Sequence, residues 1–232
     1  MLPITIDIII LSYAKNQKLQ ETTINCIKSL VNSENAAIIK FNIIIFESNS
    51  LLKNYQYPFS QTIYPQEPFN FHQYMNMGIE TSSNKYVCLC NNDLVFHANW
   101  ASEILKCMEM HPDLMSASPL CTILQPYISI ALNSGIKFGY RVGYELAGWC
   151  LFFKREMLLS TGKLDENYIF SSADYDYSNT LAVLNIKHAL ITSAWVDHLN
   201  SVTINTMSAA IQSTFNDTNY YNLKWNHRIL PF

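Results

Sequence analysis

Uninterrupted apolar runs alternate along the chain with stretches in which apolar residues recur at helical spacing. The runs predict buried strands, and the stretches between them predict amphipathic helices. Strand, helix and strand in succession are typical of βαβ units, so we expect an α/β fold with a central, mostly parallel mixed sheet flanked by helices. The expected strands cover residues 4–11, 41–46, 62–64, 86–90, 114–118, 145–153 and 189–192. One expected helix begins at residue 17, and the others cover 71–81, 98–110, 177–184 and 209–228. Asn70 is the expected N-cap of the helix at 71–81.

Length and composition fit one domain with a sizeable core. No repeat, low-complexity segment or linker interrupts the 232 residues, of which 49% are hydrophobic. Only 14% of the residues are charged, against roughly 25% in an average soluble chain. The formal charge is −3, without any block of like charge. This charge pattern argues against sequence-independent binding of nucleic acid.

The six cysteines and the first ten residues bear on the compartment. The cysteines include no Cys-x-x-Cys pair, so we interpret them as small core hydrophobes in a reducing compartment. The start lacks the basic flank and cleavage site of a signal peptide, and the apolar run 6–11 is too short to span a bilayer. We therefore expect a soluble cytoplasmic protein without a transmembrane segment, with peripheral membrane association left open.

The polar triplet Asn91-Asn92-Asp93 directly follows the apolar run 86–90. In open α/β sheets, ligands bind just beyond the carboxyl ends of the strands. One carboxylate and two amides offer the hard oxygen ligands that Mg²⁺ or Mn²⁺ prefers. An Asx-rich turn without a metal is the alternative, and this triplet alone does not decide between the two.

Three further polar clusters occur at predicted element ends: residues 47–50, Asp174 with Asp176, and Asp197 with His198. Strand ends lie along one edge of a parallel sheet, so clusters distant in sequence can converge there. Each residue type also has a purely structural interpretation. Glu47 could be a solvated turn carboxylate, Asp174 a helix N-cap, His198 a core histidine, and Trp149 ordinary core packing.

Seven segments, taken in order and spacing, carry a resemblance to a known family. They are residues 8–13 (Ile-Ile-Ile-Leu-Ser-Tyr), 43–50 (Ile-Ile-Ile-Phe-Glu-Ser-Asn-Ser), 68–71 with 76–78, 91–93 (Asn-Asn-Asp), 148–149 (Gly-Trp) with 154–156, 164–168 with 174–176, and 196–198 with Ser201 and Thr203. Together they resemble the inverting glycosyltransferases of family 2, which have the GT-A fold and use nucleotide-sugar donors. Two positions depart from the pattern: Glu47 replaces the usual Asp, and Ala173 stands where the family often has Glu.

The resemblance implies a domain organisation and a metal centre. Residues 1–232 would form a single GT-A domain, with a nucleotide-sugar-binding half at 1–97 and an acceptor-binding half with the C-terminal tail at 98–232. The chain could also be one domain of a longer transferase. Asp93 would be the main ligand of a divalent cation, completed by His198 and assisted by Asn91. An imidazole ligand favours Mn²⁺ over Mg²⁺, although Mg²⁺ would also serve.

The resemblance also implies the roles of the remaining site residues. Asp174 would be the general base that accepts the proton of the acceptor hydroxyl. The nucleotide would be bound by Ser12, Tyr13, Glu47, Asn76 and Asn92, and the sugars by Gly148, Trp149 and Asp176. The expected donor is a UDP-sugar, with GDP- and dTDP-sugars as alternatives. The acceptor would be a hydroxyl of a glycan, glycolipid or glycoprotein.

Two other functions compete with this one. A sugar nucleotidyltransferase would normally carry a glycine-rich phosphate loop after the first strand, and residues 12–17 contain no glycine. A non-catalytic sugar- or nucleotide-sugar-binding relative stays open because Ala173 removes one carboxylate. Hydrolysis of the donor in the presence of Mn²⁺ would separate an enzyme from such a relative.

Overall fold

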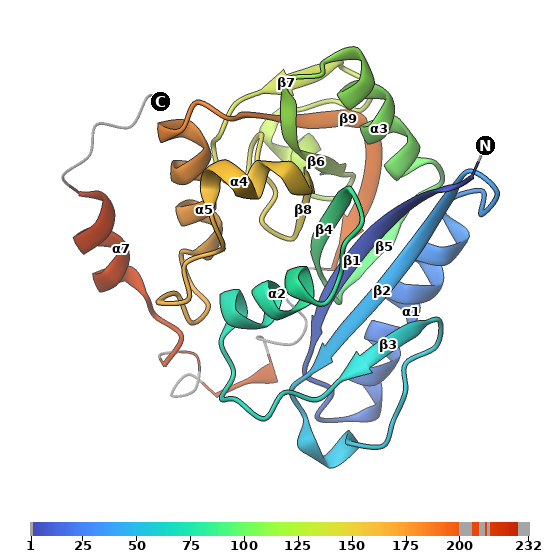
Figure 1. The fold of residues 1–232 in the computed structure, drawn as a ribbon, viewed down its shortest axis with the longest axis vertical. Helices are drawn as coiled ribbons and strands as arrows, with labels where there is room; N and C mark the ends of the chain where they lie inside the picture. Colours follow the sequence, from blue (N-terminus) through green and yellow to red (C-terminus); the bar gives the residue numbers. More distant parts are fainter. Residues whose placement is uncertain (1, 200–205, 209–211, 213, 227–232) are drawn as a thin grey trace.

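The computed structural model describes residues 2–199, 206–208, 212 and 214–226 (Figure 1). These residues form an α/β domain around one nine-stranded sheet. Ser201 and Thr203, which belong to the last matching segment, lie outside the described residues. In sheet order the strands are β3 (Ser60–Ile63), β2 (Ile39–Glu47), β1 (Ile4–Ser12), β4 (Tyr86–Asn91), β8 (Cys150–Lys154), β6 (Leu114–Cys121), β9 (Lys187–His198) and β5 (Leu94–Phe96), and β7 (Ile136–Phe138) also pairs with β9.

The four strands β3, β2, β1 and β4 run parallel to one another. Their register places Ser12 beside Glu47 and Leu11 beside Asn91. The polar clusters that follow these strands therefore lie at one edge of the sheet, as predicted. β8 runs antiparallel to β4 and β6 and makes the sheet mixed. The predicted α/β class with a central mixed sheet flanked by helices is confirmed.

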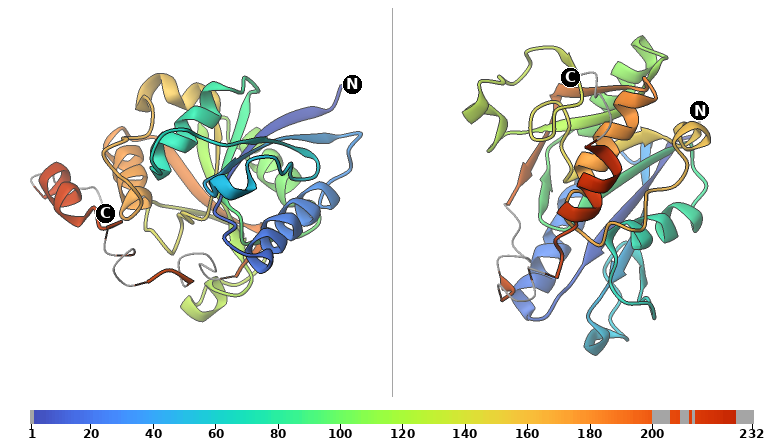
Figure 2. Two further views of the ribbon diagram at one scale, coloured as in Figure 1. Left: turned by 90° about the horizontal axis from the view of Figure 1, so that it is seen from below. Right: turned by 90° about the vertical axis from the view of Figure 1, so that its left-hand side faces the viewer.

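Helices cover both faces of the sheet (Figures 1 and 2). α1 (Gln17–Asn32) and α3 (Trp100–Met110) pack on one face, where Ile8 belongs to the same core cluster as Ile27 and Trp100. α2 (Phe71–Glu80), α4 (Leu158–Thr161) and α5 (Ala173–Val183) lie on the other face. There Ile9 shares a second cluster with Met75 and Leu181. Alternate residues of β1 thus supply both cores, as expected of a strand buried on both faces.

The helix α2 is fixed at its start and held close to the sheet. The side chain of Asn70 accepts a hydrogen bond from the backbone N–H of Gln73, which confirms the predicted N-cap. A Cβ atom on Gly78 would lie only 2.6 Å from the side chain of Ile9. Glycine at this position therefore permits the close approach of α2 to β1. The cap and this contact set the position of Phe71 at the head of the helix.

Several predicted boundaries are wrong, and the reason is long-range pairing. β9 extends to His198 instead of ending near residue 192, because β6 and β5 pair with its second half. The predicted strand 145–153 is replaced by a turn and the shorter β8, and β5 was not predicted. The helix predicted at 177–184 begins earlier, at Ala173. Within the predicted tail helix 209–228, the described helix is α7 (Thr218–Trp225), while residues 209–211, 213, 227 and 228 lie outside the described residues.

A buried ion pair connects three elements toward the amino ends of the parallel strands, away from the polar clusters at their carboxyl ends. Asp7 on β1 is fully buried and accepts a hydrogen bond of 2.8 Å from Nη2 of Arg155. The same carboxylate accepts bonds from the backbone N–H and side chain of Asn84 and from the side chain of Asn42. Arg155 also donates to the carbonyl oxygen of Ile79 at the end of α2. The pair therefore connects β1, α2 and the segment after β8.

The six cysteines are buried and free, in agreement with their interpretation as core residues. Among the helices that the structure describes, none has the length and hydropathy needed to cross a membrane.

Candidate active site

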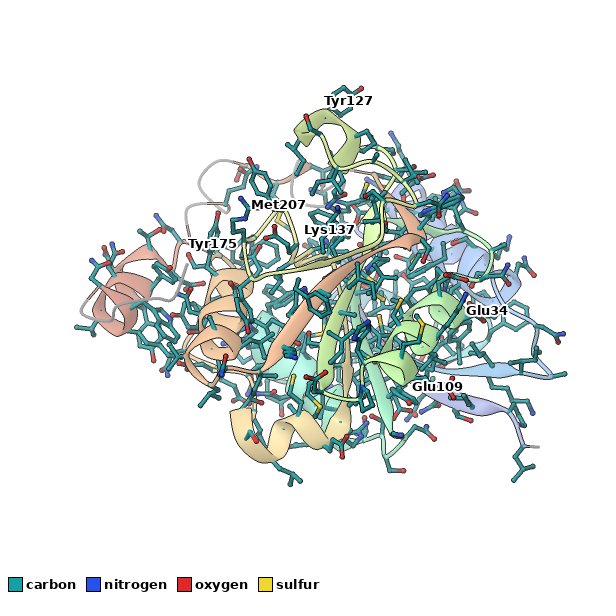
Figure 3. All side chains as sticks on the ribbon, turned by 90° about the horizontal axis from the view of Figure 1, so that it is seen from above. Glu34, Glu109, Tyr127, Lys137, Tyr175 and Met207 are labelled. Carbon is teal, nitrogen blue, oxygen red and sulfur yellow. The ribbon has the colours of Figure 1, made fainter. Side chains whose placement is uncertain are left out.

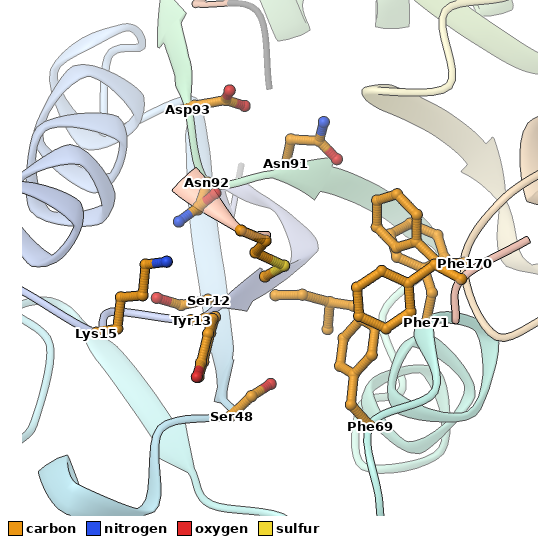
Figure 4. Close-up of a pocket in the computed structure, with 13 residues that line it drawn as sticks. Ser12, Tyr13, Lys15, Ser48, Phe69, Phe71, Asn91, Asn92, Asp93 and Phe170 are labelled. Atoms are coloured by element: carbon orange, nitrogen blue, oxygen red, sulfur yellow. The ribbon is translucent and has the colours of Figure 1, made fainter. Parts of the chain in front are cut away.

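A pocket of about 360 Å³ opens at the carboxyl ends of β1, β2 and β4. Figure 4 shows that its walls differ in character: hydrogen-bonding side chains gather on one side, and phenylalanine rings face them. The polar side comprises Ser12, Tyr13, Lys15, Ser48, Asn91, Asn92 and Asp93. The apolar lining residues are Leu11, Phe69, Phe71, Phe170, Met207 and Phe215. We refer to this cavity as the first pocket.

Asp93, which lines the first pocket, and His198 lie close together because β5 pairs with β9. Leu94 is the register partner of His198, and the backbone N–H of Leu199 donates to the carbonyl oxygen of Asp93. This pairing brings Nε2 of His198 to 3.4 Å from Oδ1 of Asp93. The amide nitrogen of Asn91 lies 3.4 Å from the same imidazole nitrogen. All three predicted metal ligands are therefore brought together.

This geometry is compatible with a divalent cation bound between the two side chains. At 3.4 Å the two atoms are farther apart than in a good hydrogen bond. Two neighbouring ligands of an octahedral ion with bonds of about 2.1 Å lie about 3 Å apart. Trp149 stacks on the imidazole at 5.0 Å between centroids and 9° between planes, which fixes the orientation of the ring. The histidine is thus held with Nε2 toward Asp93.

The protein supplies only part of a coordination shell. In the described ranges, no three His, Cys, Asp or Glu side chains are close enough to hold a metal together. Mg²⁺ and similar ions are commonly bound through one or two carboxylates, with substrate phosphates and water completing the shell. The pair Asp93 and His198, with Asn91 beside it, suits such a shared site and does not suit a closed structural metal site.

A second pocket of about 250 Å³ adjoins the first and contains Asp174. Both pockets are lined by Phe71, Asn91 and Phe170, and His198 lines the second. Asp174 lies in the first turn of α5, whose N-cap is Ser172, so the N-cap interpretation of Asp174 is wrong. Burial raises the pKa of the Asp174 carboxyl above its ordinary value. A half-buried carboxylate with a raised pKa at the wall of a pocket is suited to accept a proton.

Gly148 packs directly against the candidate base. A Cβ atom at this position would lie 2.6 Å from Cβ of Asp174 and 2.8 Å from its Oδ2. Gly148 does not have a positive φ, so its backbone conformation does not itself demand glycine. The requirement comes from the contact with Asp174. Gly148 and Trp149, both predicted at the sugar site, line the second pocket.

Replacing Gly148 by Ala should therefore displace Asp174 while sparing the first pocket. A shift of about 1 Å in a catalytic group can cost roughly 10²-fold in rate, so we expect transfer to fall by about that factor. Affinity for the donor should stay within about twofold of wild type, and binding and turnover are measured on the same preparation. Full turnover in Gly148→Ala would show that the carboxylate of Asp174 is not held by this contact.

Glu47 has a structural role that differs from the predicted contact with the nucleotide. Its side chain is 1% exposed and does not line either pocket. The carboxylate accepts hydrogen bonds from the backbone N–H groups of Ala14 (3.1 Å) and Asn49 (2.7 Å) and from the hydroxyl of Tyr57 (2.7 Å). Neither the solvated turn nor the direct contact fits this burial. Glu47 instead holds together the two loops that carry Ser12, Tyr13 and Ser48.

Asn76 and Asp176 also lie outside both pockets and position other segments. Asn76 donates to the carbonyl oxygen of Leu164 and accepts from its N–H, which holds the loop before Phe170. Asp176 accepts from Nε1 of Trp225 (2.7 Å) and pairs with Lys224 (2.8 Å). These bonds tie α7 to α5. The predicted contacts of Asn76 with the nucleotide and of Asp176 with the sugars are thus replaced by positioning roles.

Lys15 and the phenylalanine residues of the first pocket were not predicted as site residues. Among the described residues that line the first pocket, Lys15 is the one cation. Its position three residues after Ser12, at the end of the first strand, was the available signal. Phe170 comes from a loop far along the chain, and no local pattern connects it with Phe71. Asn92, which was predicted to bind the nucleotide, lines the first pocket and also donates to the hydroxyl of Thr23.

The chain is similar in structure to GalNAc-T7, as solved in a crystal structure with UDP, GalNAc and Mn²⁺. The similarity has a TM-score of 0.63 at 9% sequence identity. It covers 84% of this chain and 44% of that one, so the chain spans less than half of that protein's length. Neither a family model nor a curated protein matches the sequence. A likeness at this identity shows the fold, and the predicted GT-A-like fold is confirmed.

Proposed function

We propose that this protein is a metal-dependent inverting glycosyltransferase that moves a sugar from a nucleotide-sugar to a hydroxyl of a glycan, glycolipid or glycoprotein. One observation carries the proposal. Two adjoining pockets share Asn91; Asp93 lines the first, His198 and Asp174 line the second, and Nε2 of His198 lies 3.4 Å from Oδ1 of Asp93 across their junction. A cation held by Asp93 and His198 could thus bind a donor phosphate, and the carboxylate of Asp174 could accept the proton of an acceptor hydroxyl. The likeness to GalNAc-T7, whose structure holds UDP and Mn²⁺, supports this choice.

Asp93 and His198 would hold the cation, with Asn91 beside them. A bound Mn²⁺, or Mg²⁺, would stabilise the negative charge that develops on the departing diphosphate. The imidazole nitrogen makes Mn²⁺ the preferred ion. Lys15, on the same pocket, would add a fixed positive charge toward the phosphates.

The polar wall of the first pocket would bind the nucleotide. Tyr13 is partly exposed there and offers a ring on which a base can stack, and Ser48 and Asn92 offer hydrogen-bonding groups. The hydroxyl of Ser12 already contacts Thr23 and Tyr57, so Ser12 contributes mainly by shaping the wall. UDP is the proposed nucleotide, with GDP and dTDP as alternatives. All of these polar residues lie within 1–97, the proposed nucleotide-sugar half, and 98–232 would form the acceptor half.

Asp174 would act as the general base in a single displacement. The acceptor oxygen forms a bond to the anomeric carbon while the bond from that carbon to the diphosphate oxygen breaks, and the electron pair leaves with the diphosphate. The proton of the acceptor hydroxyl passes to the carboxylate of Asp174. One base and one displacement invert the anomeric configuration. Trp149 lines the same pocket and offers an apolar ring for the acceptor sugar.

The metal assignment predicts that Asp93→Ala weakens donor binding only where Mn²⁺ contributes. Loss of an outer-shell partner typically costs about 10–100-fold in metal affinity, and loss of a direct ligand should cost at least that much. We expect wild-type affinity for a nucleotide-sugar to rise with Mn²⁺, and this rise to disappear in Asp93→Ala. Calorimetric titrations with Mn²⁺ and with a chelator measure both.

The controls separate an enzyme from a non-catalytic relative. Asp113→Ala removes a surface carboxylate away from both pockets and should behave as wild type. Equal donor affinity with and without Mn²⁺ in the wild type would contradict the metal site. Donor binding without any hydrolysis or transfer, across a panel of acceptors, would favour the sugar-binding relative over the enzyme.

A further inference from the structure

A transferred sugar would lie at the junction of the two pockets. The apolar wall of this junction is formed by phenylalanine side chains. Phe71 and Phe170 line both pockets and contact each other edge to face, with centroids 5.6 Å apart. Phe69 and Phe215 extend this wall along the first pocket, each with a centroid 5.6 to 6.3 Å from its neighbours in the cluster. Phenylalanine carries no hydroxyl, so this wall offers no hydrogen bond.

The wall is fixed in place by the backbone. The N–H of Phe71 donates to the carbonyl oxygen of Ile169, at 2.7 Å. The N–H of Phe170 donates to the buried carboxylate of Asp217, at 2.9 Å. Each ring is nevertheless partly exposed toward the cavity. An apolar surface that is anchored in this way, at the junction of two polar sites, calls for an apolar part of the ligand.

The hydrogen-bonding groups of the first pocket lie on the opposite side, as Figure 4 shows for Asn91, Asn92 and Asp93 against Phe69, Phe71 and Phe170. A sugar placed between them can direct its ring hydroxyls toward the polar side and its exocyclic group toward the rings. A hydroxymethyl group there would lose its water without gaining a partner, whereas a methyl group would be buried favourably.

We infer, on the basis of the proposed function, that the donor is a nucleoside diphosphate 6-deoxyhexose whose C5 methyl group packs against Phe71 and Phe170. Apolar pockets discriminate against an added hydroxyl by about 10²-fold at most. The enzyme should therefore prefer a 6-deoxyhexose to the hexose that differs from it only by O6, by about 10- to 100-fold in kcat/KM.

The test compares donors that form matched pairs: UDP-glucose with UDP-6-deoxyglucose, dTDP-galactose with dTDP-6-deoxygalactose, and GDP-mannose with GDP-6-deoxymannose. Donor hydrolysis in the presence of Mn²⁺ gives kcat/KM for each member. For the pair that the enzyme uses best, we expect the 6-deoxy member to be faster by tenfold or more. A hexose that is used equally well or better overturns the inference and leaves the proposed function standing. If no member of any pair is hydrolysed while another nucleotide-sugar is, the inference is overturned; if no nucleotide-sugar is bound or hydrolysed, it is the proposed function that fails.

Two variants test the wall itself. Phe71→Tyr and Phe170→Tyr each add a hydroxyl to a ring. Each should reduce the kcat/KM ratio of the 6-deoxy donor to the matched hexose donor several-fold, because the hydroxymethyl group of the hexose then gains a hydrogen-bond partner. Phe138→Tyr, on the half-exposed ring of β7, is the matched control and should leave the ratio unchanged. Binding of the nucleoside diphosphate alone should stay at the wild-type level in all three. A weaker affinity for the bare nucleotide in both Phe71→Tyr and Phe170→Tyr, with an unchanged donor ratio, would instead assign the rings to the base and overturn the inference.

Discussion

Asp174→Asn should reduce glycosyl transfer by about 10²- to 10⁴-fold, the contribution expected of a general base. The substitution keeps the shape of the side chain and the hydrogen bond that Oδ1 accepts from the N–H of Tyr175. It removes the capacity to take a proton from the acceptor hydroxyl. Affinity for the donor with Mn²⁺ should be unchanged, because Asp174 lines the second pocket and Asp93 the first.

The pH dependence gives this prediction a second readout. A base must be deprotonated, so wild-type kcat/KM should fall as the pH drops through the pKa of Asp174. Burial raises that pKa above the ordinary value of 3.8, so the loss should begin at a higher pH than for an exposed aspartate. The residual activity of Asp174→Asn should lack this acidic limb. Asp113→Asn, a change in an exposed ion pair, is the control. Normal turnover in Asp174→Asn would remove the base assignment.

The site residues that could be predicted are those that lie at the carboxyl ends of strands. Asn91 and Asp93 follow a buried apolar run, and parallel pairing of β4 with β1 brings that run beside Ser12 and Tyr13. Such positions can be derived because a buried strand has a recognisable composition and because sheet topology fixes where its end lies. His198 was identified as a partner of Asp93 through the resemblance, and the sequence placed it after a strand and not within β9.

The parts that could not be predicted depend on contacts across the chain. Glu47 looked like a ligand because it ends a strand, but three donors from two loops bury its carboxylate. A glutamate at this position could either contact the nucleotide or hold the two loops together. The contact with Tyr57, which is distant in sequence, indicates the second role. Phe170 became part of the pocket through its backbone bond to Asp217. No local pattern encodes either contact, so the sequence could not have indicated them.

The ion pair of Asp7 and Arg155 is another contact between distant parts of the chain. Asp7→Ala should destabilise the fold by about 3–5 kcal/mol, the usual result of removing one partner of a buried pair. The substitution leaves the guanidinium of Arg155 and the amides of Asn42 and Asn84 without their shared acceptor. At roughly 2–4 °C per kcal/mol for a domain of this size, the melting temperature should fall by roughly 6–20 °C. Urea and thermal unfolding monitored by circular dichroism measure both quantities.

The control for this prediction is Asp113→Ala, which breaks an exposed pair with Lys187 and should cost less than about 1 kcal/mol. The stability that Asp7 contributes should also depend on pH in a defined direction. Burial acts to raise the pKa of Asp7, but the bonds from Asn42, Asn84 and Arg155 outweigh it and hold the pKa below 3.8. The folded state therefore binds this proton less readily than the unfolded state, so the contribution is present above pH 3.8 and is lost as the pH falls through the lowered pKa. A loss of stability in Asp7→Ala no larger than that in Asp113→Ala would mean that the connection among β1, α2 and the segment after β8 is held by packing alone.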